Sequence, residues 1–306
     1  MAQFFPKLTP DSLKEKVLVI TGGANGIGAS LVEYCCQNGA YVCFGDTAVR
    51  EGDQLAKRLS LSASWHSSPS HPQVIFCETN VTEYKAIINL FDTTLSAYGH
   101  IDHVIACAGV MEIGNWFDPN LTLEDVREPA TTEVLDVNLG GCLSVTRIAS
   151  VYLRHNRPKD ADRSITLISS VAGFKESPGL FVYQASKHGV LGLMRALRLY
   201  LPSLPFQLRI NTVCPWMTTT GMVKGVQSAW MNAGMPVNSP IDVAKVTAGI
   251  LADAQLNGKS MYVEGGRAWE IEANIDRLEP QWLGEEPSRS LAKGQAVLAD
   301  GSDWTK

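Results

Sequence analysis

The chain has 306 residues, of which 45% are hydrophobic and 19% charged, so it can build a buried core and lacks the composition of a disordered chain. Its 26 Lys and Arg against 31 Asp and Glu give a formal net charge of -5, which argues against a nucleic acid or an anionic membrane as a partner. We therefore expect a globular protein that binds a small molecule.

The cysteines and the first residues predict a cytoplasmic location. The seven cysteines are odd in number and contain no C-x-x-C pair, which predicts reduced, buried thiols. The start of the chain lacks the basic and apolar regions of a secretion signal, and no apolar run approaches the roughly 18 residues of a membrane span. We expect neither a membrane anchor nor a metal site.

From residue 16 onward, short apolar runs alternate with longer segments of helical periodicity. Such runs are typical of a parallel sheet that helices cover on both faces. We expect a Rossmann-like, doubly wound α/β fold with seven parallel strands. The predicted strands are residues 17–21, 41–45, 73–77, 103–106, 164–168, 208–213 and 260–263.

One domain is expected over residues 16–266, after an N-terminal extension at 1–15. A Ser-rich interruption with two prolines predicts an exposed loop at 61–72. The C-terminal extension, 267–306, carries eight acidic and five basic residues, as a solvated tail does. It also holds Trp269, Trp282 and Trp304, and exposed tails rarely hold three tryptophans, so packing on its own or a neighbouring subunit is the alternative.

A glycine-rich turn follows the first predicted strand. The stretch 21–28 reads Thr-Gly-Gly-Ala-Asn-Gly-Ile-Gly, and an amphipathic helix begins there. Glycines let the backbone approach a pyrophosphate, which the free N–H groups of the helix then bind. The second strand ends at Asp46, 18 residues beyond Gly28, where a carboxylate can bind a ribose diol. This combination predicts a dinucleotide site rather than a plain tight turn.

Asp46 also predicts which dinucleotide is bound. A carboxylate accepts hydrogen bonds from both ribose hydroxyls and repels a 2'-phosphate, which Arg or Lys would otherwise bind. Asn25 and Thr47 bring no positive charge, and Arg50 lies one helical turn further along. We expect NAD, with NADP as the alternative if Arg50 reaches back.

The candidate chemistry lies after the fifth strand. Ser170 precedes Tyr183 by 13 residues, and Lys187 follows Tyr183 at i+4, which places both side chains on one helix face. An ammonium near a phenol stabilises the phenolate, so this tyrosine can act as a general acid or base. An isolated Y-x-x-x-K pair is usually a surface feature, but the serine and the upstream turn favour a site.

At this point the sequence resembles the short-chain dehydrogenase/reductase family over residues 16–266, and within it the 15-hydroxyprostaglandin-dehydrogenase-like and secondary-metabolite members. The resemblance implies that Ser170 binds the substrate oxygen and Tyr183 exchanges its proton. It implies that Lys187 holds the nicotinamide ribose and that Asn138 positions a water in the proton path. The residues expected to bind the cofactor are Gly22, Asn25, Gly26, Ile27, Gly28, Asp46, Asn80, Val81, Ala108, Gly109, Tyr183, Lys187, Pro215, Thr218 and Thr220.

Two polar positions have structural alternatives. Without the family, Asn138 is equally well read as a helix-interior residue beside two glycines that permit close packing. Ser169 offers a second hydroxyl, but the spacing to Tyr183 that the family shows selects Ser170, and we expect Ser169 to be structural.

Three positions depart from the family pattern. Cys107 replaces an asparagine after the fourth strand, which puts the support of the sheet there in doubt. Asn80 replaces an aspartate before Val81 near the adenine, and we expect the pocket to survive. Trp216 replaces a glycine beside the nicotinamide, which reshapes the substrate pocket.

Residues 216–237 lie where this fold carries its substrate lid, and Lys224 is their only charged residue. Ligand pockets are mostly apolar, so we expect a hydrophobic, uncharged substrate of a polyketide-like or lipid-like kind, bound by Ser170 and Tyr183 with the lid residues Trp216, Met222 and Trp230. The alternative is that these lid side chains only pack the lid onto the core, since Met222, Val226 and Trp230 have helical spacing.

The expected activity is an NAD-dependent hydride transfer between a secondary alcohol and a ketone, in a direction that the sequence leaves open. The alternatives are a nucleotide-binding scaffold without turnover and a non-redox step, such as cyclisation or dehydration, in the same pocket. An apolar stripe on the helix after Tyr183 predicts a homodimer or homotetramer, unless the stripe covers the sheet instead. The stripe consists of Val190, Leu193, Met194, Leu197 and Leu201.

Overall fold

A computed structural model describes residues 3–9, 11–61 and 72–299. The predicted loop at 61–72 and Trp304 therefore lie largely or wholly outside the described residues. The strands are β1 (Gln3–Phe4), β2 (Val17–Thr21), β3 (Tyr41–Asp46), β4 (Val74–Glu78), β5 (His103–Ala106), β6 (Ser164–Ile168), β7 (Arg209–Pro215), β8 (Ser260–Glu264) and β9 (Arg267–Glu270).

Ten α-helices and several short helical turns connect the strands in the described part of the chain. The α-helices are α1 (Gly26–Gln37), α2 (Val49–Leu61), α3 (Tyr84–Tyr98), α4 (Glu133–Leu135), α5 (Cys142–Tyr152), α6 (Phe181–Tyr200), α7 (Lys224–Asn232), α8 (Pro240–Ala252), α9 (Glu272–Leu283) and α10 (Glu285–Ala299). The turns are η1 (Asp125–Arg127), the π-helix η2 (Asp136–Gly141), η3 (Val171–Gly173), η4 (Leu201–Ser203) and η5 (Gly221–Val223).

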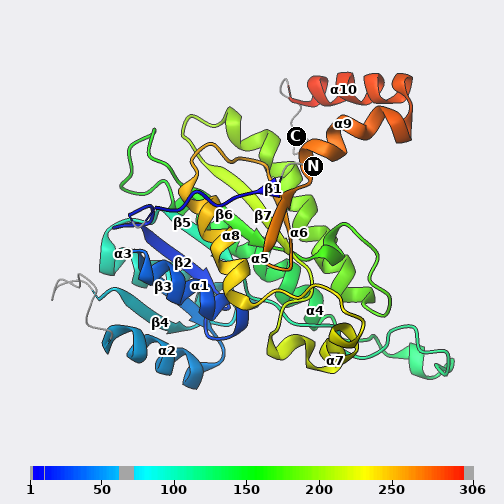
Figure 1. Ribbon diagram of the computed structural model, residues 1–306, viewed down its shortest axis with the longest axis horizontal. Helices are drawn as coiled ribbons and strands as arrows, with labels where there is room; N and C mark the ends of the chain where they lie inside the picture. The colour runs from blue at the N-terminus through cyan, green and yellow to red at the C-terminus, as the bar shows by residue number, and fades with distance from the viewer. Residues whose placement is uncertain (1–2, 10, 62–71, 300–306) are drawn as a thin grey trace.

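All seven predicted strands are present and pair in parallel, in the order β4-β3-β2-β5-β6-β7-β8. The order reverses between β2 and β5, and α/β sheets of this kind bind ligands beyond the carboxyl ends of the strands at such a point. The doubly wound fold is thus confirmed (Figure 1).

Two short antiparallel strands, β9 and β1, extend the sheet to nine strands beyond β8. Gly265 and Gly266 both have positive φ, 55° and 73°, which suits the tight turn that reverses the chain between β8 and β9. The expected boundaries at residues 15 and 266 therefore do not coincide with the edge of the sheet, because both extensions contribute a strand.

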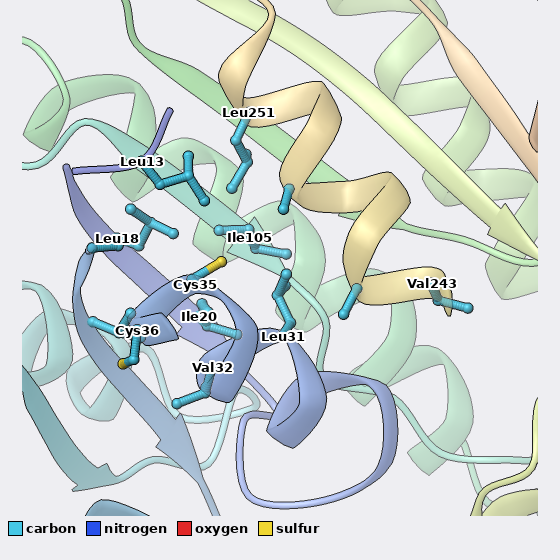
Figure 2. Close-up of a cluster of buried hydrophobic side chains, with 14 of the residues drawn as sticks. Leu13, Leu18, Ile20, Leu31, Val32, Cys35, Cys36, Ile105, Val243 and Leu251 are labelled. Carbon is cyan, nitrogen blue, oxygen red and sulfur yellow. The ribbon is translucent and has the colours of Figure 1, made fainter. Parts of the chain in front are cut away.

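Successive side chains of the central strands point to opposite faces of the sheet, so a hydrophobic core forms on each face. Leu18 and Ile20 of β2 belong to the core under α1, α2 and α8, and Figure 2 shows Ile20 beside Leu31 of α1 and Leu18 below Leu13. Val19 points to the other face, under α3, α5 and α6. Among the described residues one helical stretch, Glu133–Tyr152, is long and apolar enough to cross a membrane, and several of its apolar side chains, including Val145 and Ile148, belong to this second core.

The apolar stripe on α6 belongs to the chain's own core. Val190, Met194 and Leu201 are at most 3% exposed, and Leu193 and Leu197 pack against them. The stripe therefore covers the sheet, which was the alternative to an interface. The homodimer or homotetramer stays a prediction without this support.

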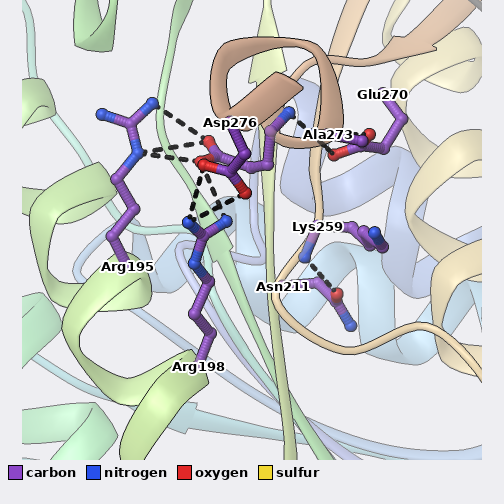
Figure 3. A network of polar contacts seen from close by, with 8 residues as sticks. Arg195, Arg198, Asn211, Lys259, Glu270, Ala273 and Asp276 are labelled. Carbon is purple, nitrogen blue, oxygen red and sulfur yellow. Dashed lines mark hydrogen bonds and ion pairs between the residues drawn. The ribbon is translucent and has the colours of Figure 1, made fainter. Parts of the chain in front are cut away.

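The C-terminal extension is folded over residues 267–299 and anchored to α6. Glu272, which is 1% exposed, forms ion pairs with Arg195 at 3.0 Å and Arg198 at 3.1 Å. Arg198 also pairs with Asp276 at 3.3 Å (Figure 3). Trp269 stacks on Tyr262, with ring centroids 5.8 Å apart. The start of this segment packs on its own subunit, as the alternative to a solvated tail supposed. Helices α9 and α10 stand away from the sheet in Figure 1, and nearly all of their described residues are exposed or half-buried.

Candidate active site

The turn after β2 has room for glycine alone at two positions. A Cβ on Gly22, whose φ is 70°, would lie 2.6 Å from the Ala108 Cα, and a Cβ on Gly28 would lie 1.9 Å from the Gly22 oxygen. No side chain caps the N-terminus of α1. The free N–H groups and the close-packed turn fit the pyrophosphate of a dinucleotide.

Asp46 stands at the end of β3 beside this turn. Its Oδ2 accepts a hydrogen bond from the Ala24 N–H and its Oδ1 from the Ala48 N–H, both at 2.9 Å. These bonds fix the carboxylate at the edge of the nucleotide cavity and leave acceptor capacity for ribose hydroxyls. Arg50 is exposed and does not line the cavity.

On the expected adenine side, Asn80 and Val81 both line the cavity. The Asn80 oxygen accepts from the Thr82 N–H at 3.1 Å, and its amide nitrogen donates to Glu83 at 3.1 Å. Asn80 thus shapes the turn after β4 while it lines the cavity, and its contribution to an adenine pocket stays a prediction.

Cys107 causes no loss of support after β5. The Thr21 hydroxyl accepts hydrogen bonds from the backbone N–H groups of Cys107 at 3.2 Å and Ala108 at 3.4 Å. Burial raises the pKa of the Cys107 thiol to about 12, so the thiol stays protonated and inert at neutral pH. The doubt raised by this substitution is thereby removed, because the backbone contacts come from Thr21.

Asn138 lies in the π-helix η2 and is 1% exposed. Its oxygen accepts from the Val110 N–H at 2.8 Å, and its amide donates to the Val110 oxygen at 2.9 Å and to the Ser186 hydroxyl at 3.1 Å. A π-turn inside a helix frequently marks a functional site. Asn138 therefore joins the segment after β5 to α6, and its side chain does not line the cavity.

Tyr183 and Lys187 share one face of α6, as their spacing predicts. The Lys187 nitrogen lies 5.5 Å from the centre of the Tyr183 ring and donates to the Ile168 oxygen at 3.1 Å. Lys187 is 5% exposed, and no ion pair in the described residues includes it. Its remaining donors are available to a group in the cavity that it lines.

The two serines after β6 have different partners. The Ser169 hydroxyl donates to the Lys187 backbone oxygen at 2.9 Å, which agrees with the structural role expected for it. The Ser170 hydroxyl accepts from the Ala172 N–H at 3.2 Å and keeps its proton free to donate at the cavity wall. Ser170 is therefore the serine able to bind a substrate oxygen.

One cavity of about 1030 Å³ joins the nucleotide turn to the catalytic candidates. All the predicted site residues except Asn138 line it. They are Gly22, Asn25, Gly26, Ile27, Gly28, Asp46, Asn80, Val81, Ala108, Gly109, Ser170, Tyr183, Lys187, Pro215, Trp216, Thr218, Thr220, Met222 and Trp230. The sequence reasoning missed other lining residues, including Met111, Glu133 and Leu180, which lie in segments without a motif.

The lid closes one side of the cavity with aromatic rings. Trp216 and Trp230 meet edge to face, with ring centroids 5.0 Å apart at 79°. The Trp230 indole donates to the Pro236 oxygen at 2.9 Å. Met222 and Val226 also line the cavity and are 44% and 55% exposed, so they are not packed into the core as the alternative supposed.

Comparisons with known proteins identify the family and the fold. A family model described as short chain dehydrogenase matches residues 16–230. The short-chain dehydrogenase/reductase ascJ of Acremonium egyptiacum is 32% identical over 86% of this chain and 83% of its own length. The 5'-hydroxyaverantin dehydrogenase of Dothistroma septosporum is 26% identical over 90% of this chain and 91% of its length.

A plant enzyme and a bacterial crystal structure are also similar to this chain. The (+)-borneol dehydrogenase 1 of Salvia officinalis is 29% identical over 83% of this chain and 94% of its length. The crystal structure of a dehydrogenase/reductase from Sinorhizobium meliloti superposes with a TM-score of 0.69 at 23% identity, covering 84% of this chain and 97% of that one. At that identity the structural match concerns the fold alone.

Proposed function

Since this chain belongs to the short-chain dehydrogenase family of oxidoreductases, we propose that it transfers a hydride between NAD and a secondary alcohol or ketone of a hydrophobic molecule. The observation that carries the proposal is the shared cavity, in which Ser170, Tyr183 and Lys187 line the same space as the glycine turn and Asp46. A dinucleotide at the turn and a small molecule under the lid would meet beside Tyr183.

In the direction of oxidation, NAD supplies the acceptor for the hydride of the alcohol carbon. Ser170 donates a hydrogen bond to the substrate oxygen and holds it near Tyr183. The Tyr183 phenolate takes the hydroxyl proton as the carbon loses its hydride, and the Lys187 ammonium stabilises that phenolate. Reduction of a ketone uses the same groups in reverse, with Tyr183 as the acid.

Asp46 supports NAD as the preferred cofactor. Its carboxylate is held by two backbone N–H groups at the cavity wall, and neither Asn25 nor Thr47 beside it carries a positive charge. Lys187 is the only Lys or Arg among the described residues that line the cavity, so a 2'-phosphate at Asp46 would face a negative charge.

The lid supports a hydrophobic substrate. Trp216, Trp230 and Met222 line the cavity. Relatives named as dehydrogenases of 5'-hydroxyaverantin and (+)-borneol point to the same kind of alcohol. Flexible methionine beside rigid tryptophan suits a large apolar ring system.

A panel of alcohols tests the proposal. The protein is incubated with NAD and either (+)-borneol, an aromatic secondary alcohol, lactate or a sugar alcohol, while the nicotinamide absorbance is followed. We expect reduction of NAD with the apolar alcohols and none with lactate or the sugar alcohol. NAD binding without any redox change would instead support a scaffold, and conversion of a substrate at constant absorbance would support a non-redox step.

A further inference from the structure

Helix α6 begins at the proposed catalytic tyrosine without a local cap. Its N-cap residue, Leu180, offers no side-chain hydrogen bond. The first N–H groups of a helix have no partner within the helix and need another acceptor. In α6 two of these groups belong to Val182 and Tyr183, so whatever binds them also holds the backbone of the tyrosine.

Glu112 provides that acceptor from a distant part of the chain. Its Oε1 accepts from the Val182 N–H at 3.1 Å, and its Oε2 accepts from the Tyr183 N–H at 2.7 Å. The two partners are 70 and 71 residues away in sequence. Of the ion pairs in the described part of the chain none includes Glu112, so its two oxygens serve the helix.

The carbonyl of Tyr183 is linked through two side chains to the segment that contains Glu112. The Ser186 hydroxyl donates to the Tyr183 oxygen at 2.6 Å and accepts from the Asn138 amide at 3.1 Å. Asn138 in turn pairs with both backbone groups of Val110. Both the N–H and the carbonyl of Tyr183 therefore connect to residues 110–112, at the end of the stretch 107–111 that lines the cavity.

We propose that Glu112 is a positioning residue that fixes Tyr183 relative to the cofactor side of the cavity. The inference rests on the proposed function. A carboxylate at a helix N-terminus is favoured by the helix dipole, and two bonds from one carboxylate restrict both the rotation and the translation of the first turn. A variant without Glu112 keeps the side chains of Ser170, Tyr183 and Lys187. It loses the two hydrogen bonds that restrict the first turn of α6 and, with it, the position of Tyr183.

The chain contains a matched control in the C-terminal extension. Glu270 caps α9 with the same chemistry, because its Oε1 accepts from the Glu272 N–H at 2.8 Å and its Oε2 from the Ala273 N–H at 3.1 Å (Figure 3). Glu270 does not line the cavity. Glu112→Ala and Glu270→Ala thus each remove a carboxylate that binds two successive N–H groups, one next to Tyr183 and one remote from it.

The test compares the two variants for kcat, for the Kd of NAD and for amide hydrogen exchange. With the apolar alcohol selected by the panel, we expect Glu112→Ala to lose about tenfold or more in kcat and Glu270→Ala to keep its kcat. The Kd of NAD stays within about twofold in both, since the glycine turn is untouched. Exchange at Val182 and Tyr183 accelerates only in Glu112→Ala, and Glu112→Gln, with one acceptor oxygen, recovers part of the lost kcat.

Equal kcat in the two alanine variants would overturn the positioning role. If Glu112→Ala does not fold, Glu112→Gln is compared with Glu270→Gln by the same criteria. If the wild-type protein turns over no alcohol, the proposed function fails, and hydrogen exchange still decides about Glu112. Unchanged exchange at Val182 and Tyr183 would then reject the cap itself.

Discussion

The two halves of the cavity are held in the fold by different means. In the nucleotide half, the glycine turn and Asp46 extend from strands of the sheet interior and are bound by backbone hydrogen bonds. In the lid half, neither η5 nor α7 contains a buried residue, whereas all seven residues of the preceding strand β7 are buried. The proposed nucleotide contacts therefore extend from the sheet, whereas the proposed substrate contacts include a surface segment.

The lid is attached at a few points near its ends. The Asn238 amide, 0% exposed, donates to the Val263 oxygen at 2.9 Å, and its oxygen accepts from the Gly266 N–H at 3.0 Å. The Trp216–Trp230 contact joins the beginning of the lid to α7. Changes in the nucleotide half should affect every substrate alike, and changes in the lid should discriminate among substrates.

Removing the hydroxyl of Tyr183 should have the largest effect. We expect Tyr183→Phe to fold, to bind NAD and to lose about 10²- to 10⁴-fold in kcat with every active alcohol, which is the usual contribution of general acid–base catalysis. Steady-state kinetics with two different alcohols measure this loss. A kcat near that of the wild type would remove Tyr183 from the mechanism.

The sheet should lose stability in mild acid because of His103. Burial lowers the pKa of His103 to about 4, although the nearby Asp162 carboxylate opposes this, while its ordinary value is 6.5. Between these values the unfolded chain binds the proton and the folded chain does not. The free energy of unfolding should therefore fall as the pH drops from 6.5 to 4, by about 3 kcal/mol at the lower end.

Denaturant unfolding at a series of pH values measures the His103 effect. We expect His103→Gln to flatten the dependence between pH 6.5 and 4, and His188→Gln, at an exposed position of α6, to retain it. A slope in His103→Gln equal to that of the wild type would assign the acid sensitivity to other groups.

Asp46 should set the cofactor preference without affecting the choice of alcohol. We expect Asp46→Ala to lower the ratio of kcat/KM with NAD to that with NADP by about tenfold or more, since the carboxylate no longer binds the diol or repels the 2'-phosphate. Thr47→Ala, next to it in the cavity wall, is the control. A strong NAD preference that survives in Asp46→Ala would contradict this role.

Trp216 should have the smallest and most selective effect. We expect Trp216→Gly to change KM several-fold, by different factors for a small and a large apolar alcohol, while the Kd of NAD stays within about twofold. Trp282→Ala on the exposed face of α9 controls for the loss of an indole. Weaker NAD binding with uniform effects on all alcohols would identify Trp216 as a cofactor or folding residue.

The sequence predicted those parts of the fold and of the site that depend on local patterns. The seven parallel strands and the nucleotide turn follow from apolar runs and a glycine pattern, which are local signals. Ser170, Tyr183 and Lys187 follow from spacings within one stretch and from the family resemblance. The positions of these side chains depend on the local main-chain conformation, and a short motif is enough to predict that conformation.

What the sequence did not reveal depends on contacts between distant segments. The two-residue strand β1 carries no periodicity, although the Gly265-Gly266 pair was a usable signal for the hairpin that adds β9. Glu112 reaches α6 across 70 residues and has no motif. The apolar stripe on α6 was predicted only in part. Its periodicity correctly indicated a buried face, but it does not tell whether the sheet or a second subunit covers that face.

Direct transfer of a labelled hydride tests the central claim. The apolar alcohol selected by the panel is prepared with deuterium on its carbinol carbon and incubated with NAD and the wild-type protein or Tyr183→Phe. We expect mass spectrometry to find the deuterium on the reduced nicotinamide with the wild type and far less product with the variant. Reduced nicotinamide without deuterium, or ketone formed without reduced nicotinamide, would contradict hydride transfer at this site.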